Sequence, residues 1–203
     1  MPDREKASPP MRTVRPLDAS TWAAFEELCV ASNSYPSGCW CIGFHEEGTT
    51  RDATCNRERK HARVVSGTAH AALVLDDGRC IGWCQYGPAT EVVRIKNRRQ
   101  YDASQDGPLP DWRIGCVYAR TGHRRQGVAA FALDGALRMI AAAGGGRVEG
   151  YPEPADAVPA GFLFHGALST FERAGFVRTR SIGKHRWVVT KTIEPASTAI
   201  RGR

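Results

Sequence analysis

The fold is decided by residues 116–129, which read CVYARTGHRRQGVA. An apolar, strand-like run leads into a basic turn that contains glycine, and a helix-forming stretch rich in alanine and leucine follows directly. The first amides of a helix have no carbonyl partner within the helix, so they and the positive end of the helix dipole attract anions. Arg124 and Arg125 add positive charge here, while Gly127 and Ala129 allow a ligand to approach the backbone closely. The segment therefore predicts a binding site for a diphosphate, as in a nucleotide-derived cofactor.

Secondary structure is predicted on both sides of this segment. The turn Asp76-Asp77-Gly78-Arg79 predicts a β-hairpin between residues 69–75 and 80–86, because its central residues suit positive φ angles. Residues 87–111 hold three prolines and two glycines and predict a long excursion, with a short helix near residues 92–99. Further strands are expected at residues 12–17, 112–119, 147–151, 176–180 and 185–192, and helices at residues 18–33, 50–65, 126–143 and 164–174.

The pattern Arg124-x-x-Gly127-x-Ala129, with an apolar strand before it and a helix after it, resembles the acyl-CoA-binding motif of the GNAT superfamily of N-acetyltransferases. The order of the predicted elements from about residue 13 to residue 192 is similar to that family as well. The resemblance implies an α/β (α+β) fold with a mixed, mostly antiparallel central sheet, whose central strands splay apart and which helices flank. It also implies that acetyl-CoA is a co-substrate.

The resemblance implies a role for each part of the motif. Backbone groups of Val117 and Ala119 would face the pantetheine arm and the acyl carbonyl, and residues 124–129 would hold the diphosphate. Backbone donors fixed in a strand also suit the oxyanion that forms when an amine attacks a thioester. The residues expected to contact the cofactor are Val117, Tyr118, Ala119, Arg124, Arg125, Gln126, Gly127, Val128, Ala129 and Phe171.

Acetylation of an amine requires the nitrogen to be neutral, and at pH 7 only about one amine in 10³ with a pKa near 10.4 has lost its proton. A general base is therefore useful. Glu149 is the candidate, because it lies within a predicted strand beside the expected gap and because a family glutamate often lies on a strand here. The alternative is that Glu149 faces solvent or pairs with a cation such as Arg147.

The position of the general acid departs from the family pattern. Many members place a tyrosine four residues before the Gly-Phe that ends the last helix, and this chain has Phe171 there. Phenylalanine donates no proton, so Phe171 is expected to pack against the cofactor or the core. Tyr118, Tyr151 and His165 are alternative acids. A thiol with a pKa near 8.5 is also a fair leaving group as its anion, so turnover need not be lost.

The seven cysteines are an odd number and lie mostly within predicted helices and strands, which indicates a reducing, cytoplasmic setting rather than a disulfide framework. Cys39-x-Cys41 and the pair Cys80 and Cys84 do not have zinc-knuckle spacing, so no metal is expected. No stretch approaches 18 apolar residues, so no membrane partner is expected. Four aromatic residues are interpreted as core, with an acceptor pocket as the alternative; they are Trp40, Phe44, Trp83 and Tyr86.

The net charge of +7 does not by itself indicate a nucleic-acid partner. More than half of the excess comes from the two ends of the chain, and the remaining basic clusters lack interleaved aromatic residues, Tyr101 excepted. No nucleic acid is therefore expected. A protein that binds nucleic acid through its basic loops stays an alternative hypothesis.

The leading hypothesis is a single acetyl-CoA-dependent N-acetyltransferase domain at residues 12–192, with a disordered leader at 1–11 and a flexible tail at 193–203. The amine would attack acetyl-CoA directly in a ternary complex. The acceptor is a small-molecule amine or a protein amine, and residues 38–45 and 87–111 are the expected specificity elements. The alternative is an acyl-CoA-binding sensor or interaction module with little or no turnover. A homodimer is left open.

Overall fold

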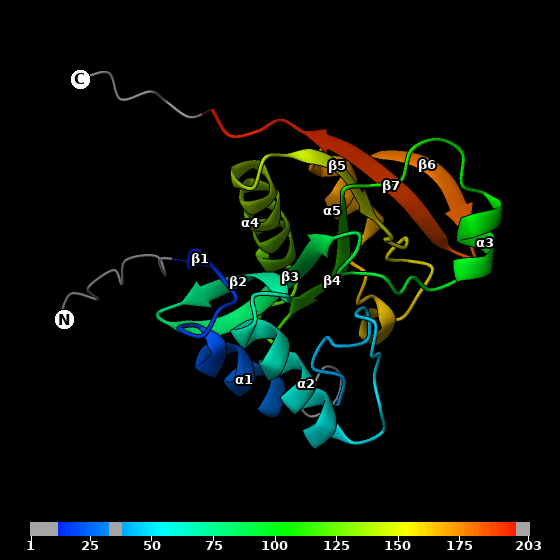
Figure 1. Ribbon diagram of the computed structural model, residues 1–203. Helices are drawn as coiled ribbons and strands as arrows, with labels where there is room; N and C mark the ends of the chain where they lie inside the picture. The colour runs from blue at the N-terminus through cyan, green and yellow to red at the C-terminus, as the bar shows by residue number, and fades with distance from the viewer. Residues whose placement is uncertain (1–11, 33–37, 198–203) are drawn as a thin grey trace, which may run out of the picture.

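A seven-stranded sheet forms the centre of the protein (Figure 1). The computed structural model describes residues 12–32 and 38–197, without the side chain of Ala160. The predicted leader and residues 198–203 of the predicted tail lie outside the described residues. In spatial order the strands are β1 (Arg12–Pro16), β2 (His70–Asp76), β3 (Arg79–Pro88), β4 (Trp112–Ala119), β5 (Gly146–Gly150), β7 (Arg186–Ile193) and β6 (Val177–Ile182).

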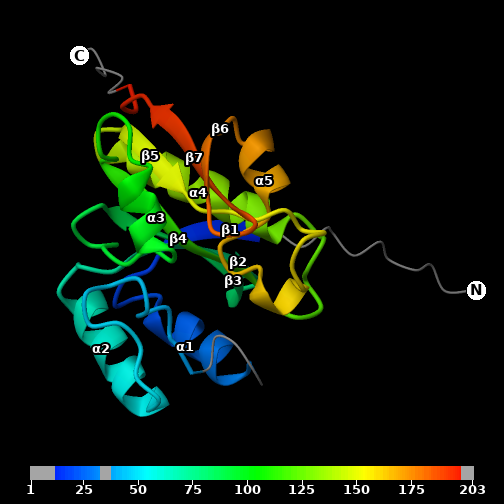
Figure 2. The same ribbon diagram turned by 90° about the vertical axis from the view of Figure 1, so that its right-hand side faces the viewer.

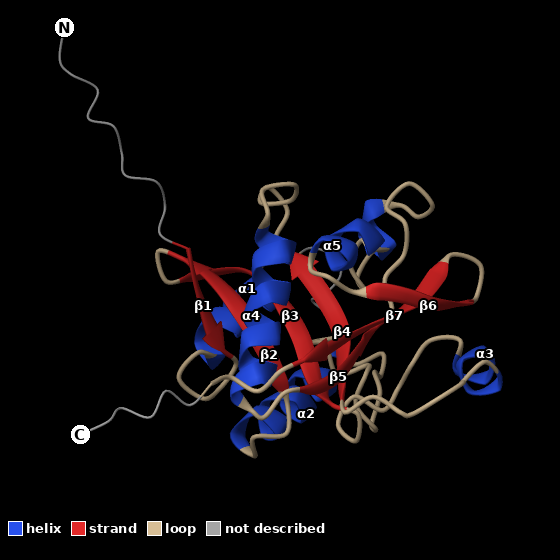
Figure 3. Ribbon diagram, turned by 90° about the horizontal axis from the view of Figure 1, so that it is seen from above, coloured by secondary structure: helices blue, strands red, loops and turns tan. Residues whose placement is uncertain are grey.

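Five α-helices and one 3₁₀ turn accompany the sheet in the described part of the chain. They are α1 (Trp22–Val30), α2 (Ala53–Val65), α3 (Arg98–Ala103), α4 (Val128–Ala142), α5 (Leu168–Arg173) and the turn η1 (Ala160–Phe162). Helices α1 and α2 cover one face of the sheet, and α4 and α5 cover the other (Figures 1 and 2). Seen from above, α4 runs along the strands at the β1–β4 side of the sheet (Figure 3). The expected mixed α/β fold with a mostly antiparallel sheet is confirmed, because among the seven described strands β4 and β5 form the one parallel pair.

The side chains of β4 divide between two layers of the core. Cys116 and Tyr118 pack in the cluster with α1, whereas Ile114 and Val117 pack in the cluster with α4. Ile114 and Val117 are three positions apart and share a face because the register with β3 shifts between them, as it does at a β-bulge. The predicted hairpin is confirmed as well: Asp77 and Gly78 have φ angles of 46° and 80°, which is the geometry that a tight two-residue turn requires.

The central strands β4 and β5 splay apart, as expected. They pair only at Trp112–Val148 and Arg113–Glu149, and no further pair follows toward the end of β4. The ring of Phe171 fills the base of the gap, because a Cβ atom on Gly150 or on Gly166 would collide with it. Both glycines are therefore required by the close packing of this ring.

Helices α3 and α5 begin later than expected. Helix α3 covers residues 98–103 rather than 92–99, because Asn97 adopts a left-handed φ of 60° and the preceding segment is tied to Phe44 through the amide of Arg94. Helix α5 begins at Leu168 rather than Phe164, because residues 163–167 run beside β4 instead. In both cases apolar residues three or four positions apart imitate a helical stripe that tertiary contacts override.

The carboxyl end of the domain extends slightly beyond the predicted boundary at residue 192. Strand β7 includes Ile193, and the amide of Ala196 donates to the carbonyl of Ala141 at 2.8 Å. None of the helices in the described residues is long and apolar enough to cross a membrane.

Candidate functional site

A cavity of about 610 Å³ lies where the end of β4 and the start of α4 meet the segment that leads into α5. The lining residues that the sequence predicted are Val117, Tyr118, Ala119, Arg124, Arg125, Gly127, Val128 and Ala129. The structure therefore brings most of the predicted cofactor-binding residues to one cavity.

The turn before α4 leaves the first amides of that helix available to a ligand. Gly127, the N-cap residue, has a φ of 78°, and no side chain caps the helix. A Cβ atom on Gly127 would meet no heavy atom within 4 Å, so the glycine borders open space. The first intrahelical bond runs from Phe131 to the carbonyl of Gly127 at 2.9 Å, which leaves the amides of residues 128–130 for an anion.

The charge of this cavity is positive. Arg124, Arg125 and Arg173 are exposed and line it, and among the described residues no carboxylate does. An oxyanion here would gain both the helix dipole and guanidinium donors. Arg173 belongs to α5 and was not among the predicted contacts, because the sequence does not show that α5 returns to the turn before α4.

Gln126 is the one residue of the predicted loop that does not line the cavity. Its carbonyl and its Oε1 accept hydrogen bonds from Arg12 at 2.7 and 3.1 Å, and its Nε2 donates to the carbonyl of Gly122 at 2.8 Å. Gln126 therefore connects β1 to the turn before α4. It would affect a ligand indirectly, because it holds that turn in position.

The amide of Val117 already has a partner. It donates to the carbonyl of Phe164 at 2.8 Å, and the neighbouring His165 contacts the carbonyl of Gly115 through Nδ1 at 2.9 Å. The segment 163–166 therefore runs along the edge of β4 that the sequence assigned to the pantetheine arm. Val117 and Ala119 still line the cavity, but the Val117 amide can meet an acyl carbonyl only if Phe164 releases it.

Glu149 does not line this cavity and lies in a closed cluster of side chains on the α3 side of the sheet. It is fully buried, and its Oε2 accepts hydrogen bonds from Tyr101 at 2.8 Å and from Tyr151 at 3.1 Å. Arg180 lies 3.9 Å from its other oxygen. Burial, together with this carboxylate, raises the pKa of Tyr101 and of Tyr151, so both phenols remain donors. This enclosure does not support the predicted role of Glu149 as general base and indicates a structural role.

Phe171 is likewise a core residue rather than a cofactor contact. Its side chain is fully buried, it meets Phe176 edge to face at 5.1 Å between ring centroids, and it does not line the cavity. Of the three alternative acids, Tyr151 is held by Glu149, and burial lowers the pKa of His165 well below its ordinary value. Tyr118 lines the cavity, and its hydroxyl lies 3.2 Å from the Oγ of Ser32.

A second cavity, of about 700 Å³, lies beside the first. Its lining combines residues from both predicted specificity elements with the segment before α5, and the two cavities share Gly161 and Phe164. Of the four aromatic residues considered for an acceptor pocket, Phe44 lines this cavity, whereas Trp40, Trp83 and Tyr86 belong to the core. The lining residues are Gly43, Phe44, Thr49, Val93, Arg94, Ile95, Lys96, Arg98, Gly161, Phe162 and Phe164.

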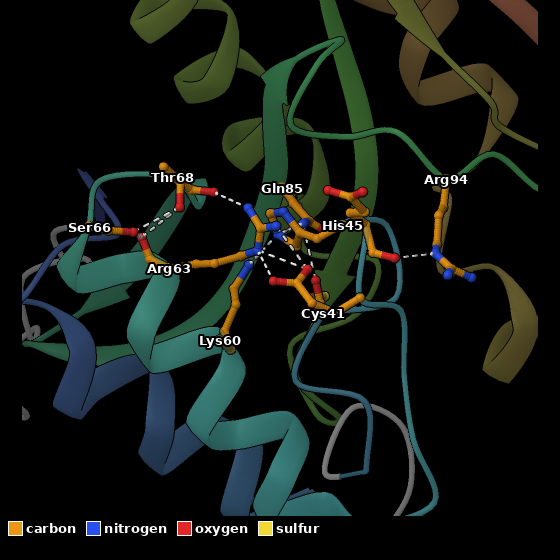
Figure 4. Close-up of polar contacts among 10 residues, drawn as sticks. Cys41, His45, Lys60, Arg63, Ser66, Thr68, Gln85 and Arg94 are labelled. Atoms are coloured by element: carbon orange, nitrogen blue, oxygen red, sulfur yellow. Dashed lines mark hydrogen bonds and ion pairs between the residues drawn. The ribbon is translucent and has the colours of Figure 1, made fainter.

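A buried polar cluster under β3 supports the loop that carries Phe44 (Figure 4). The Nε2 of His45 lies 2.9 Å from the Nε2 of Gln85 and 3.3 Å from the Nζ of Lys60, and all three side chains are fully buried. Because both partners are donors, Nε2 is an acceptor and the imidazole is neutral. Burial is the main cause that lowers the pKa of His45 to about 2, and nearby Lys60 adds to it.

This cluster predicts a pH-dependent stability. His45 is neutral in the folded protein but gains a proton below about pH 6.5 when unfolded, so its contribution is complete above that pH and declines toward its folded pKa of about 2. Between pH 6.5 and 5 we expect His45→Gln to remove about 2 kcal/mol of the acid-induced decrease in the free energy of unfolding. Denaturant unfolding at both pH values measures this difference, and equal decreases in the two proteins would contradict it.

The similarity of the chain to solved structures is to acetyltransferases. YncA from Salmonella typhimurium, solved with its cofactor acetyl-CoA, is 14% identical, with 94% of this chain and 99% of that chain covered and a TM-score of 0.54. The GNAT family N-acetyltransferase YhbS from Escherichia coli, in complex with CoA, is 13% identical, with coverage of 93% and 85% and a TM-score of 0.52. Mosquito arylalkylamine N-acetyltransferase-like 5b is 9% identical, with 90% of this chain and 100% of that chain covered and a TM-score of 0.55.

The sequence itself gives no such match. Neither the models of protein families nor the curated proteins compared with it match the chain. The similarity is therefore one of architecture: a sheet with a parallel, splayed central pair, and a helix that begins without a side-chain cap after β4 and covers one face of the sheet. The chain has the fold of the GNAT acetyltransferases, as its sequence motif predicted.

Proposed function

We propose that the protein is an acetyl-CoA-dependent N-acetyltransferase that acts on a primary amine in a ternary complex. The observation that carries this proposal is the first cavity, which connects the uncapped start of α4 with the splayed end of β4. One end of that cavity suits a diphosphate, and the other borders the end of β4, where Val117, Tyr118 and Ala119 line it.

Different residues of the first cavity would bind different parts of acetyl-CoA. The amides of residues 128–130 would receive the diphosphate, with Arg124 and Arg125 as charged donors. The backbone of Ala119 would pair with the arm, and Val117 would lie beside the acyl carbonyl. Because the Val117 amide is bonded to Phe164, we propose that binding exchanges the Phe164 carbonyl for the thioester oxygen.

The reaction forms one bond and breaks another. The nitrogen of the neutral amine attacks the carbonyl carbon of the thioester and forms a C–N bond. The C–S bond then breaks, the sulfur leaves as a thiolate, and the nitrogen loses its extra proton to solvent. No carboxylate of the described residues lines the first cavity, so we propose that the environment of the acceptor, rather than Glu149, keeps the amine neutral.

Restoring the family tyrosine at the last helix is not expected to help the reaction. In Phe171→Tyr the new hydroxyl would be enclosed beside Gly150 and Gly166, and burial without a partner costs about 1–3 kcal/mol of stability. We expect a lower unfolding midpoint and no gain in the rate of CoA release. Phe162→Tyr is the control for stability, because Phe162 is 67% exposed and its hydroxyl would be solvated. A faster Phe171→Tyr enzyme of unchanged stability would contradict this account.

Release of CoA from acetyl-CoA in the presence of a panel of amines tests the proposed function. Amine-dependent release, with the acetylated amine identified by mass spectrometry, supports it. The second candidate, an acyl-CoA-binding module without turnover, is favoured by the engaged Val117 amide and by Phe171, and it predicts acetyl-CoA binding without release. Absence of acetyl-CoA binding would exclude both. The cytoplasm is the proposed setting, because the cysteine pattern suits a reducing compartment.

A further inference from the structure

We propose that the second cavity receives the acceptor, and that the acceptor is a small amine that carries an oxyanion, either carboxylate or phosphate, on an apolar body. This inference rests on the proposed function and names its substrate class. The cavity volume of about 700 Å³ is in the range of small-molecule sites.

The position of this cavity suits an acceptor. Phe164 and Gly161 line both cavities, so only the segment before α5 separates the two. The carbonyl of Phe164 is bonded to Val117, the residue beside which the acyl group is proposed to lie. An amine in the second cavity would therefore reach the thioester at the point where Phe164 must move for the acyl group to bind.

The charge of the second cavity is positive and only partly neutralised. In the part of the chain that the structure describes, its charged lining residues are Arg94, Lys96 and Arg98, and no carboxylate lines it. Arg98 is paired with Asp102 at 2.7 Å. Within residues 12–32 and 38–197, neither Arg94 nor Lys96 has a carboxylate within 4.0 Å. Arg94 and Lys96 therefore remain available to bind an anionic group of a ligand.

The side chain of Arg94 is held in a fixed position that leaves the two terminal nitrogens of its guanidinium available to a ligand. Its Nε donates to the carbonyl of Glu46 at 3.0 Å, and its backbone amide donates to Phe44 at 3.0 Å. The guanidinium also lies against Gly48, where a Cβ atom would come within 2.9 Å of its central carbon. Figure 4 shows the two terminal nitrogens pointing away from the carbonyl that Nε contacts. A guanidinium fixed in this way suits a carboxylate or phosphate, because less side-chain entropy is lost on binding.

Lys96 places the second positive charge next to Phe164, which lines both cavities. Its Nζ lies 4.2 Å from the centre of the Phe164 ring. Burial and the nearby Arg186 lower the pKa of Lys96. The same two causes would lower the pKa of an acceptor amine that binds beside it. Cations on this side of the cavity would favour the neutral form of a substrate amine, which suits a site without a carboxylate base.

The apolar part of the lining defines the body of the acceptor. Phe44, Ile95, Phe162 and Phe164 contribute it, and Phe162 is 67% exposed in a molecule whose large apolar residues are mostly buried. A ligand with an aromatic or aliphatic body would cover this ring and bring its oxyanion to Arg94.

Matched pairs of amines test the substrate class. L-phenylalanine is compared with 2-phenylethylamine, and O-phosphoethanolamine with ethanolamine, at equal concentrations of neutral amine. We expect kcat/KM to be at least about tenfold higher for the anionic member of one pair, and the pair that shows the difference identifies carboxylate or phosphate. Equal or better use of both uncharged partners would overturn the proposal.

Variants locate the effect in the second cavity. Arg94→Gln is expected to reduce the preference for the anionic amine about tenfold, mainly through KM, and Lys96→Gln to reduce it in the same direction. Arg99→Gln is the matched control, because Arg99 is an exposed arginine of α3 that lines neither cavity. A preference that both cavity variants retain, or that Arg99→Gln loses equally, would overturn the assignment.

A binding measurement separates failure of this inference from failure of the proposed function. Calorimetry with 3-phenylpropionate, with and without CoA, probes the anion site without any turnover. Binding to the wild type that weakens about tenfold in Arg94→Gln supports the inference even if no amine is acetylated. If amines are acetylated while neither 3-phenylpropionate nor inorganic phosphate binds, the transferase proposal stands and the anionic acceptor is rejected.

Discussion

Acetyl-CoA binding should weaken about a hundredfold when both Arg124 and Arg125 are replaced by glutamate, because each reversal replaces a charge-assisted contact by repulsion worth about 1.4 kcal/mol or more. Both side chains line the first cavity beside the uncapped start of α4. The single variants should each lose about tenfold. Isothermal titration calorimetry with acetyl-CoA measures the dissociation constants directly.

Lys184→Glu is the control for a general effect of charge. Lys184 is exposed between β6 and β7 and lines neither cavity, so its reversal should leave the affinity within about twofold at moderate salt. An unchanged affinity in the Arg124 and Arg125 variants, or an equal loss in Lys184→Glu, would show that the cofactor does not bind at this turn.

The largest expected effect on stability is that of Glu149→Ala. Removing the carboxylate leaves the hydroxyls of Tyr101 and Tyr151 without their acceptor and Arg180 without its counter-charge. Loss of one partner of a buried charged network costs about 3–5 kcal/mol, so we expect a corresponding decrease in the free energy of unfolding. Denaturant unfolding monitored by tryptophan fluorescence measures it.

Glu172→Ala provides the matched control. Glu172 pairs with Arg178 at 2.6 Å, but both side chains are well exposed, so its removal should cost less than about 1 kcal/mol. Glu149→Gln separates the structural role from the catalytic one: the structural role predicts lower stability and a pH profile of kcat with the wild-type shape. Normal stability with loss of the acidic limb of that profile, along which the rate falls as the base gains a proton, would instead identify Glu149 as the base.

The sequence carried enough information for the fold and for the anion site. The hairpin at Asp77-Gly78 and the strand, turn and helix around Gly127 depend on contacts between neighbours in the chain, so local rules describe them correctly. The basic turn was recognisable because helix termini attract anions wherever they occur.

The remaining features of the site depend on contacts between distant segments. The sequence does not show on which face of β5 Glu149 lies relative to α3, and Tyr101 reaches it from 48 positions away. The apolar residues at 92 and 95 and at 164 and 168 imitate helical spacing, yet residues 92–95 and 164–167 run as loops beside the cavities. Periodicity alone does not separate a helical stripe from a loop whose side chains pack at the same interval.

The crystal structure of the protein with acetyl-CoA tests the central claim most directly. We predict the diphosphate within hydrogen-bonding distance of the amides of residues 128–130 and the thioester beside Val117, with the Phe164 carbonyl displaced from the Val117 amide. A diphosphate bound elsewhere on the protein, or an acyl group that does not enter the space between β4 and β5, would contradict the account.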